Sequence, residues 1–323
     1  MILFYSTFFS KPVDIGSIPY DGPGGFTLDK RRIAEATAVV FHIPNYREIG
    51  DAFKYPGQYW IGWTMESRQN YKRFNDPMFM RHFDFTVTHE TKSEIWTPYI
   101  PIKSWWDEVM AMPIPAKTET APLALFVSKS KSNHSGRMDL IEGLWEHIPI
   151  DSYGRFKRNR TIELPDLGSR SKLAAIGRYR FGFAFENSKE PDYVTEKIYD
   201  CFKAGTVPIY LGAPNVAEFA PPGSYINADD FGSARDLADY LKYLIETPQA
   251  YEAFFAWRSK PLPDFLAERI RVLETPLFIR LLDFIRQEAD NRPSNPAGRP
   301  GLPFGRREYL STRLRKWKKK VPQ

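Results

Sequence analysis

The sequence contains very little cysteine and no long apolar run. Its single cysteine, Cys201, cannot form a disulfide within the chain, so nothing in the sequence requires an oxidising compartment, and we expect a small buried side chain there. No apolar stretch approaches the roughly 20 residues that a membrane-spanning helix needs. The apolar run 1–6 is too short for a secretory signal peptide and has no basic flank, so we expect it to form the first strand.

The composition is that of a globular protein. The chain has 323 residues, of which 42% are hydrophobic and 26% charged, and this length allows two domains of ordinary size. Aromatic residues reach 15%, which is high. Many will lie in the core, but an excess of aromatic rings also suits the binding of sugars, whose C–H faces pack on them.

The net charge of +6 comes from the carboxyl-terminal end of the sequence. Residues 301–323 hold eight basic residues and the single acid Glu308, so residues 1–300 sum to −1. The preceding segment 291–301 is rich in Pro and Gly and is typical of a linker. Apolar side chains that share one face of a short basic helix favour peripheral contact with an anionic membrane. A solvated, disordered end is an alternative; we expect no nucleic-acid binding, because no recognised module accompanies the basic cluster.

Alternating strand and helix patterns predict an α/β fold with two domains. Strand-like runs occur at 1–7, 38–42, 59–65 and 83–89, and the proline-rich stretch 111–122 is the expected hinge. A second layered unit begins at 123–128 and continues through a helix at 138–147, a strand at 150–153 and helical patterns over 233–289, among them 277–286, which Pro276 can open. The predicted divisions are a first domain, 1–115, a second domain, 116–290, and a linker with a basic tail, 291–323.

The most informative segment is 180–212. Phe181, Phe183 and Phe185 alternate with small residues, which predicts a buried strand; Thr195 can cap the helix that follows, and 207–211 is a second strand. Such a unit makes the two strands parallel, and ligands bind beyond the carboxyl ends of parallel strands. The polar residues expected at that edge are Glu186, Asn187, Tyr193, Glu196 and Lys197.

A lysine at the start of a helix suits a phosphate group, because the helix terminus already presents backbone N–H groups. The segment is therefore consistent with a site for a nucleoside diphosphate. The pair Glu196 and Lys197 is equally typical of a solvated helix face with a favourable end charge, and the pattern alone leaves both interpretations open.

The same residues resemble a known family. The runs Phe-Ala-Phe-Glu-Asn-Ser, Asp-Tyr-Val-Thr-Glu-Lys-Ile and Val-Pro-Ile-Tyr-Leu-Gly, within 183–212, resemble the signature of the α-1,3-fucosyltransferases, glycosyltransferase family 10. The segments 63–67, 83–88, 126–128 and 220–231 follow in the family's order, so the resemblance covers about residues 1 to 245. It implies two doubly wound Rossmann-like domains that face a cleft, the GT-B arrangement, with the sugar nucleotide on the second domain and the acceptor on the first.

The resemblance also implies a reaction. A family member transfers L-fucose from GDP-fucose to O3 of N-acetylglucosamine in an N-acetyllactosamine-like glycan, with inversion at the anomeric carbon. Glu66 matches the catalytic glutamate, which serves as general base, although a strand-end glutamate can also be a plain surface residue. Arg137 and Lys197 match groups that bind the diphosphate. The remaining matches to donor-binding residues are Asn187, Tyr193 and Glu196.

Asp229 and Asp230 raise the question of a metal ion. An acidic pair can bind a divalent cation together with substrate phosphates. Because two basic residues already serve the diphosphate, we expect no required metal and no cofactor beyond the donor substrate. The five histidines show no zinc-ligand spacing.

Two segments depart from the family's pattern. These are 89–94 and 68–81, where the proline that normally follows the catalytic Glu-Ser is missing. Both fall where acceptor loops are expected, so the acceptor is less well defined than the donor. A transferase for another GDP-sugar and an inactive glycan-binding relative are the alternatives. Without an anchor or a disulfide, the chain resembles bacterial members, which implies a cytoplasmic enzyme with the basic tail as a contact to the inner face of the membrane.

Overall fold

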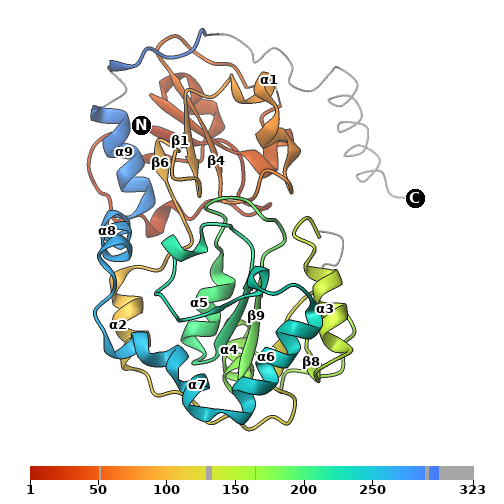
Figure 1. Cartoon of the computed structure of the whole chain (residues 1–323). Helices are drawn as coiled ribbons and strands as arrows, with labels where there is room; N and C mark the ends of the chain where they lie inside the picture. Colours follow the sequence, from red (N-terminus) through yellow and green to blue (C-terminus); the bar gives the residue numbers. More distant parts are fainter. Residues whose placement is uncertain (51, 129–132, 164, 288–290, 298–323) are drawn as a thin grey trace. The chain divides into compact units, whose positions relative to one another are not determined.

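Two compact α/β units make up the described part of the chain (Figure 1). Unit 1 comprises Met1–Thr97 together with the described residues from Thr275 onward, and unit 2 comprises Pro98–Glu274. Each unit has a single sheet in which all strands are parallel. The computed structural model describes residues 1–50, 52–128, 133–163, 165–287 and 291–297.

The sheet of unit 1 has the strand order β2-β1-β3-β4-β5-β6. Its strands are β1 (Ile2–Phe4), β2 (Phe26–Thr27), β3 (Ala38–His42), β4 (Tyr59–Thr64), β5 (Phe85–Thr88) and β6 (Ile95–Trp96). The helices of the unit are η1 (Ile15–Ser17), η2 (Lys30–Glu35), η3 (Ile43–Glu48), η4 (Lys72–Asn75), α1 (Pro77–Met80) and α9 (Leu277–Gln287).

Both faces of this sheet are buried, which is why its central strands β3 and β4 are buried at every position and are apolar at nearly all of them rather than at alternate ones. Trp60 and Phe41 point to the face that also buries Phe74 and Phe79. Ile61 and Trp63 point to the opposite face. The first two predicted central strands, 38–42 and 59–65, are therefore confirmed almost residue for residue.

The helix α9 covers the second of these faces. Its residues Leu281, Leu282 and Ile285 are buried in the cluster that includes Ile61 and Trp63. This helix falls within the predicted second domain, 116–290, but its apolar face completes the core of unit 1. The prediction that it starts directly after Pro276 is confirmed, since α9 begins at Leu277.

The sheet of unit 2 has the strand order β11-β10-β9-β7-β8. Its strands are β7 (Leu123–Leu125), β8 (Ile150–Ser152), β9 (Phe181–Phe185), β10 (Val207–Leu211) and β11 (Ile226–Asn227). The α-helices are α2 (Lys103–Ala111), α3 (Arg137–Trp145), α4 (Ser169–Gly177), α5 (Glu196–Lys203), α6 (Ala234–Glu246), α7 (Pro248–Glu252) and α8 (Asp264–Leu273). The 3-10 helices are η5 (Val216–Glu218), η6 (Ala228–Asp230) and η7 (Ala253–Ser259).

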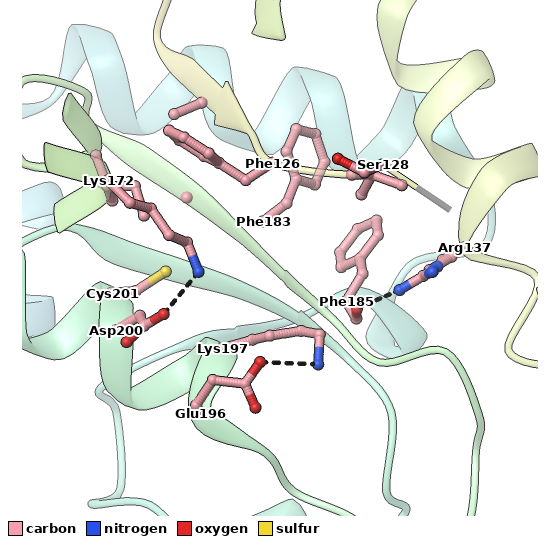
Figure 2. Close-up of a pocket in the computed structure, with 14 residues that line it drawn as sticks. Phe126, Ser128, Arg137, Lys172, Phe183, Phe185, Glu196, Lys197, Asp200 and Cys201 are labelled. Atoms are coloured by element: carbon pink, nitrogen blue, oxygen red, sulfur yellow. Dashed lines mark hydrogen bonds and ion pairs between the residues drawn. The ribbon is translucent and has the colours of Figure 1, made fainter. Parts of the chain in front are cut away.

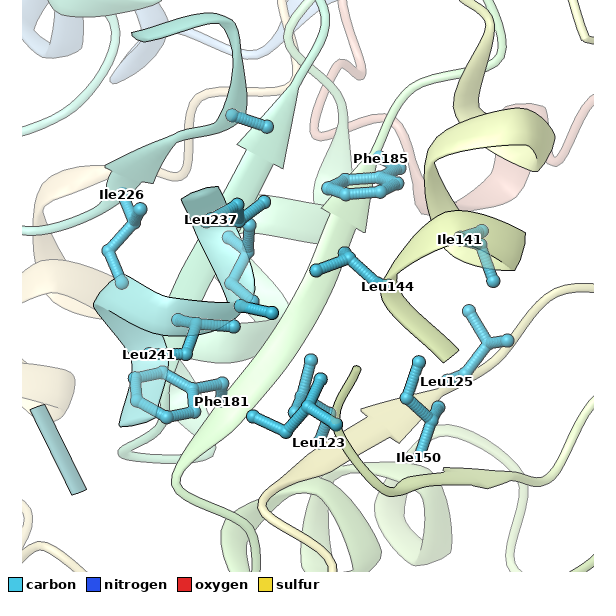
Figure 3. Packing of buried hydrophobic residues seen from close by; sticks show 14 of the residues in the cluster. Leu123, Leu125, Ile141, Leu144, Ile150, Phe181, Phe185, Ile226, Leu237 and Leu241 are labelled. Carbon is cyan, nitrogen blue, oxygen red and sulfur yellow. The ribbon is translucent and has the colours of Figure 1, made fainter. Parts of the chain in front are cut away.

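Large and small residues alternate along β9, so the two faces of this strand pack against different helices. Phe181 and Phe185 enter the main core, where α3 contributes Leu144 and α6 contributes Leu241 (Figure 3). Gly182 faces the other way, and a Cβ atom added there would lie 2.7 Å from the sulfur of Cys201 on α5. Since only glycine leaves that space, the sequence lets α5 approach the strand closely. The expected burial of Cys201 is confirmed.

The observed organisation differs from the predicted one in three respects. The first unit ends at Thr97 rather than at residue 115, and the expected hinge at 111–122 lies inside unit 2. The described part of the predicted linker, 291–297, is attached to unit 1, because Asn295 donates hydrogen bonds to Asp84 and to the carbonyls of two neighbouring residues. The basic tail 301–323 lies outside the described residues.

Across the described ranges, no helix is both long enough and apolar enough to cross a membrane.

Candidate active site

A buried carboxylate organises the end of β9. Glu186 follows the strand directly and is fully buried. Its carboxylate accepts hydrogen bonds from the backbone N–H and the hydroxyl of Thr195, at 2.8 and 2.9 Å, and from the ammonium of Lys197 at 2.9 Å. The start of α5 is thereby fixed to the carboxyl end of β9, in the place where parallel sheets bind ligands.

The two charged partners control each other's protonation. Burial raises the pKa of Glu186, and the nearby Lys197 opposes that rise. Burial by itself would lower the pKa of Lys197, but Glu186 and Glu196 outweigh it, so that this pKa lies above its usual value. Lys197 is therefore positively charged at neutral pH, and about a quarter of its side chain is exposed.

Thr195 does not cap the helix in the way that the sequence predicts. It occupies the position before α5, but its side chain makes no capping hydrogen bond to the helix backbone. Its hydroxyl instead donates to Glu186 and accepts from Lys197, whose ammonium lies 2.6 Å away. The hydroxyl binds these two ionised groups rather than a backbone N–H of the helix, because hydrogen bonds to ionised groups are stronger than those to neutral ones.

The start of α3 is attached to the same strand end through three successive carbonyls. Arg137 donates from Nη1 to the carbonyl oxygen of Phe185 at 3.3 Å (Figure 2). The hydroxyl of Ser135 donates to the carbonyl of Glu186 at 2.6 Å, and the backbone N–H of His134 donates to that of Asn187 at 3.0 Å. The Arg137 side chain is thus held beside the Glu186 and Lys197 pair, and burial lowers its pKa from the usual high value.

Three of the predicted donor-binding residues, Arg137, Glu196 and Lys197, line one pocket of unit 2. Figure 2 shows Arg137, Glu196 and Lys197 around a space that Phe126 and Ser128 also line. Glu196 is half exposed, and its carboxylate lies 3.5 Å from the Lys197 ammonium.

Tyr193 and Asn187 have different positions around this strand end. The Tyr193 side chain is buried. Asn187 directly follows Glu186 and is partly buried. The structure therefore assembles Arg137, Asn187, Tyr193, Glu196 and Lys197 around the end of one strand.

Sequence reasoning missed two features of this pocket. Glu186 was expected at this edge but was given no role, whereas its carboxylate binds both Thr195 and Lys197. Lys172 of α4 and Asp200 of α5 form an ion pair of 2.7 Å in the pocket wall (Figure 2). The signal for Asp200 was its position one helical turn after Glu196, whereas nothing local could have indicated Lys172.

The acidic pair near the site is engaged with the protein itself. Asp229 forms an ion pair of 2.5 Å with Lys189, and Asp230 accepts a hydrogen bond from Asn227. Among the described residues, no group of three or more His, Cys, Asp or Glu side chains could hold a metal ion. That no metal ion is required stays a prediction.

The remaining candidate, Glu66, belongs to unit 1. It lies just after the carboxyl end of β4, and its backbone N–H donates to the hydroxyl of Thr64 at 3.0 Å. Its side chain is partly buried. The pKa of Tyr71 is raised mainly by the burial of Tyr71 itself and also by the negative charge of Glu66. Glu66 thus lies at the carboxyl edge of its own sheet, as the other candidates do in unit 2.

Comparison with known families is consistent with this arrangement. Residues 1–100 match the family described as "Fucosyltransferase, N-terminal". Residues 114–290 match "Glycosyltransferase family 10 (fucosyltransferase) C-term". The chain belongs to glycosyltransferase family 10. It is a fucosyltransferase, and its Glu66 and its Arg137 to Lys197 pocket fall within these two matched regions.

The relatives of this fucosyltransferase include mammalian enzymes. The chimpanzee (Pan troglodytes) "4-galactosyl-N-acetylglucosaminide 3-alpha-L-fucosyltransferase FUT6" is 31% identical over 282 residues, which cover 83% of this chain and 75% of that protein. The human (Homo sapiens) "4-galactosyl-N-acetylglucosaminide 3-alpha-L-fucosyltransferase FUT5" is 31% identical over 275 residues, which cover 81% of this chain and 71% of that protein. The chimpanzee "3-galactosyl-N-acetylglucosaminide 4-alpha-L-fucosyltransferase FUT3" is 30% identical, again with coverage of 81% and 71%.

Solved structures share the fold. An "alpha1,3-Fucosyltransferase with GDP-fucose" superposes with a TM-score of 0.54 at 18% identity and covers 80% of each chain. The same kind of enzyme "with GDP" gives a TM-score of 0.53 at 19% identity and covers 81% of each chain. The fucosyltransferase therefore has the GT-B class of fold, with one parallel α/β sheet in each of its two units.

Proposed function

We propose that this fucosyltransferase transfers L-fucose from GDP-fucose to O3 of the N-acetylglucosamine in an N-acetyllactosamine-like glycan, with inversion at the anomeric carbon. The observation that carries the proposal is the network in which Glu186 and Thr195 hold Lys197 beside Arg137. Relatives named as 3-alpha-L-fucosyltransferases of 4-galactosyl-N-acetylglucosaminides support the acceptor. A structure of similar fold named as a complex with GDP-fucose supports the donor.

The two cations are suited to a diphosphate. Arg137 offers a planar fork that binds two oxygens at once, and Lys197 adds a compact positive charge. Both are oriented before any ligand arrives, Arg137 by a backbone carbonyl and Lys197 by a buried carboxylate. Groups fixed in this way stabilise charge that develops in the transition state without a cost of reorganisation. We assign them to the diphosphate of GDP, which gains negative charge as it leaves.

The chemical step needs one base. The acceptor hydroxyl oxygen attacks the anomeric carbon of fucose from the side opposite GDP and forms the new glycosidic bond. The bond from that carbon to the diphosphate breaks, and its electron pair leaves with GDP. The hydroxyl proton goes to the carboxylate of Glu66, which lies at the carboxyl edge of the sheet in unit 1.

The other predicted residues bind the donor. Glu196 presents a half-exposed carboxylate that can accept hydrogen bonds from the hydroxyls of fucose or ribose. Asn187 and Tyr193 lie around the same strand end and complete the donor pocket. No metal enters the proposal, because Arg137 and Lys197 supply the positive charge at the diphosphate.

An assay with two donors tests this proposal. The protein is incubated with N-acetyllactosamine and either GDP-fucose or GDP-mannose, and the released GDP and the mass of the product are measured. We expect GDP release and a product heavier by one fucose only with GDP-fucose, with the linkage at O3 established by NMR. Transfer from GDP-mannose would show a different donor specificity, and saccharide binding without transfer would show an inactive glycan-binding protein.

A further inference from the structure

A strained turn presents an aromatic ring at the carboxyl edge of the sheet in unit 1. Phe8 and Lys11 exchange two backbone hydrogen bonds, of 2.8 and 2.9 Å, around Phe9 and Ser10. Both central residues have positive φ, 46° for Phe9 and 70° for Ser10. This is the pattern of a type I′ turn, which strongly favours Asn and Gly, and a phenylalanine there stores conformational strain.

Hydrogen bonds to the 3-10 helix η3 hold this turn in place. The backbone N–H of Phe9 donates to the side chain of Asn45 at 3.1 Å. The Asn45 amide in turn donates to Glu48 at 2.9 Å, and Glu48 accepts from the backbone N–H of Thr7 at 2.8 Å. The strained conformation is therefore maintained by specific contacts, and strain of this kind is concentrated at functional sites.

The result of this strain is an exposed ring above a layer of buried rings. The Phe9 side chain is 44% exposed. Beneath it, its edge contacts His42, with 4.7 Å between the ring centres, and the preceding Phe8 stacks on Trp63 at 4.9 Å. Trp63 lies on β4, three residues before Glu66.

A second ring connects Phe9 to the neighbourhood of Glu66. The centre of the Tyr71 ring lies 6.5 Å from that of Phe9. Burial raises the pKa of Tyr71, and the nearby negative charge of Glu66 raises it further. Tyr71 also forms part of the wall of a cavity of about 350 Å³ in unit 1, a size that is ordinary for ligand pockets. The cavity is further lined by Ile43, Tyr46, Asn70, Lys72, Arg73 and Asp76.

We propose that the exposed ring of Phe9, with the Tyr71 ring inclined at 60° beside it, forms a stacking shelf for a sugar ring of the acceptor. The C–H face of a pyranose packs on aromatic rings, and the amide, hydroxyl and ammonium groups of the adjoining cavity suit its hydroxyls. The shelf rests on the proposed function in one respect, namely that Glu66 receives the acceptor's proton. It identifies the turn after β1 as a determinant of acceptor affinity, a role for which the sequence of the turn gives no sign.

Three variants test the shelf. Phe9→Gly removes the ring and suits the positive φ, Phe9→Tyr keeps a ring, and Ser10→Gly relieves strain at the next position without touching the ring. We expect Phe9→Gly to raise the KM for N-acetyllactosamine about tenfold, which corresponds to about 1.4 kcal/mol, while the KM for GDP-fucose and kcat stay near wild type. Phe9→Tyr and Ser10→Gly should keep the wild-type KM for the acceptor.

Two results would overturn the shelf. One is an acceptor KM for Phe9→Gly within twofold of wild type, and the other is an equal rise in the KM for GDP-fucose, which would indicate a merely structural role. If the wild-type protein transfers no fucose, the proposed function fails, and calorimetric titration with N-acetyllactosamine tests the shelf by itself. Weaker binding by Phe9→Gly than by Ser10→Gly would then support the shelf, and equal binding, or none by wild type, would refute it.

Discussion

The two sheets present opposite kinds of chemistry at their carboxyl edges. In unit 2 the edge is made of charges that are already paired, with Glu186 between Thr195 and Lys197, and with Arg137 on a backbone carbonyl. In unit 1 the edge is made of rings, with Phe9 exposed above buried aromatic side chains and Glu66 near them. Under the proposed function, the same architecture prepares one edge for a highly charged ligand and the other for a nearly neutral, hydroxylated one.

The largest expected effect is on the rate of transfer and comes from the edge of unit 1. Glu66→Gln should slow transfer by roughly 10²–10⁴-fold, because the base is lost, while GDP binding stays near wild type. Steady-state rates and calorimetric titration with GDP measure the two effects. Wild-type turnover by this variant would show that Glu66 is not the base. Lost GDP affinity would show that the edge of unit 1 also contributes to binding GDP.

The next effect concerns the stability of the charged edge. Glu186→Gln leaves Lys197 without its buried counter-ion, and breaking such a pair costs about 3 kcal/mol of unfolding free energy. Chemical denaturation measures this loss, and weaker GDP binding should accompany it. The matched control is Lys242→Gln, which removes one partner of an exposed pair on α6 and should cost less than about 1 kcal/mol. Equal losses in the two variants would show that the buried pair does not organise the site.

Smaller effects are expected for the cations themselves. Lys197→Ala and Arg137→Ala should each weaken GDP binding by about 1.5–3 kcal/mol, since charge-assisted contacts to phosphate oxygens are lost. Lys203→Ala, on the same helix as Lys197 and paired with Glu108, is the control that should bind GDP normally. Unchanged affinity in both site variants would refute the assignment of the diphosphate to this edge.

A chelator should have no effect on the rate. Because Arg137 and Lys197 supply positive charge at the proposed diphosphate site, activity should persist in EDTA. The comparison is the initial rate with EDTA and with added manganese. Loss of activity in EDTA that manganese restores would favour a metal role for Asp229 and Asp230.

The smallest effect on catalysis is expected for the basic tail, residues 301–323. Its deletion should leave transfer to a soluble acceptor near wild type but reduce sedimentation with anionic vesicles at low salt, since each basic residue near such a surface contributes about 1 kcal/mol. Higher salt should weaken the binding of the full-length chain through screening. Equal sedimentation of both chains at low salt would show that the tail makes no membrane contact.

Local patterns predicted those parts of the fold that local forces determine. The strand β9, the helix α5 and the strand β10 follow from alternation, apolar spacing and Gly205, so their order could be read from the sequence. The role of Glu186 could not, because its burial depends on Lys197, 11 positions away, folding back onto it. The assignment of α9 failed for a similar reason, since an amphipathic pattern shows that a helix packs but not on which sheet.

The candidate site likewise has a part that the sequence predicted and a part that it did not. The resemblance to the family signature placed the predicted donor-binding residues together, and in the structure they lie around the end of β9. The turn at Phe9 and Ser10 escaped prediction, because neither residue type is typical of positive φ and the contacts that impose it come from Asn45.

The return of α9 to the first sheet has a consequence for folding during synthesis. The ribosome releases all five strands of unit 2 before it releases Leu281, Leu282 and Ile285, the residues that complete the core of unit 1. Domains generally fold as units while the chain emerges. Unit 2 can therefore acquire its native structure first, while one apolar face of the sheet in unit 1 is still uncovered. A chain that stops before Leu277 should leave that face exposed and aggregate, although its unit 2 is complete.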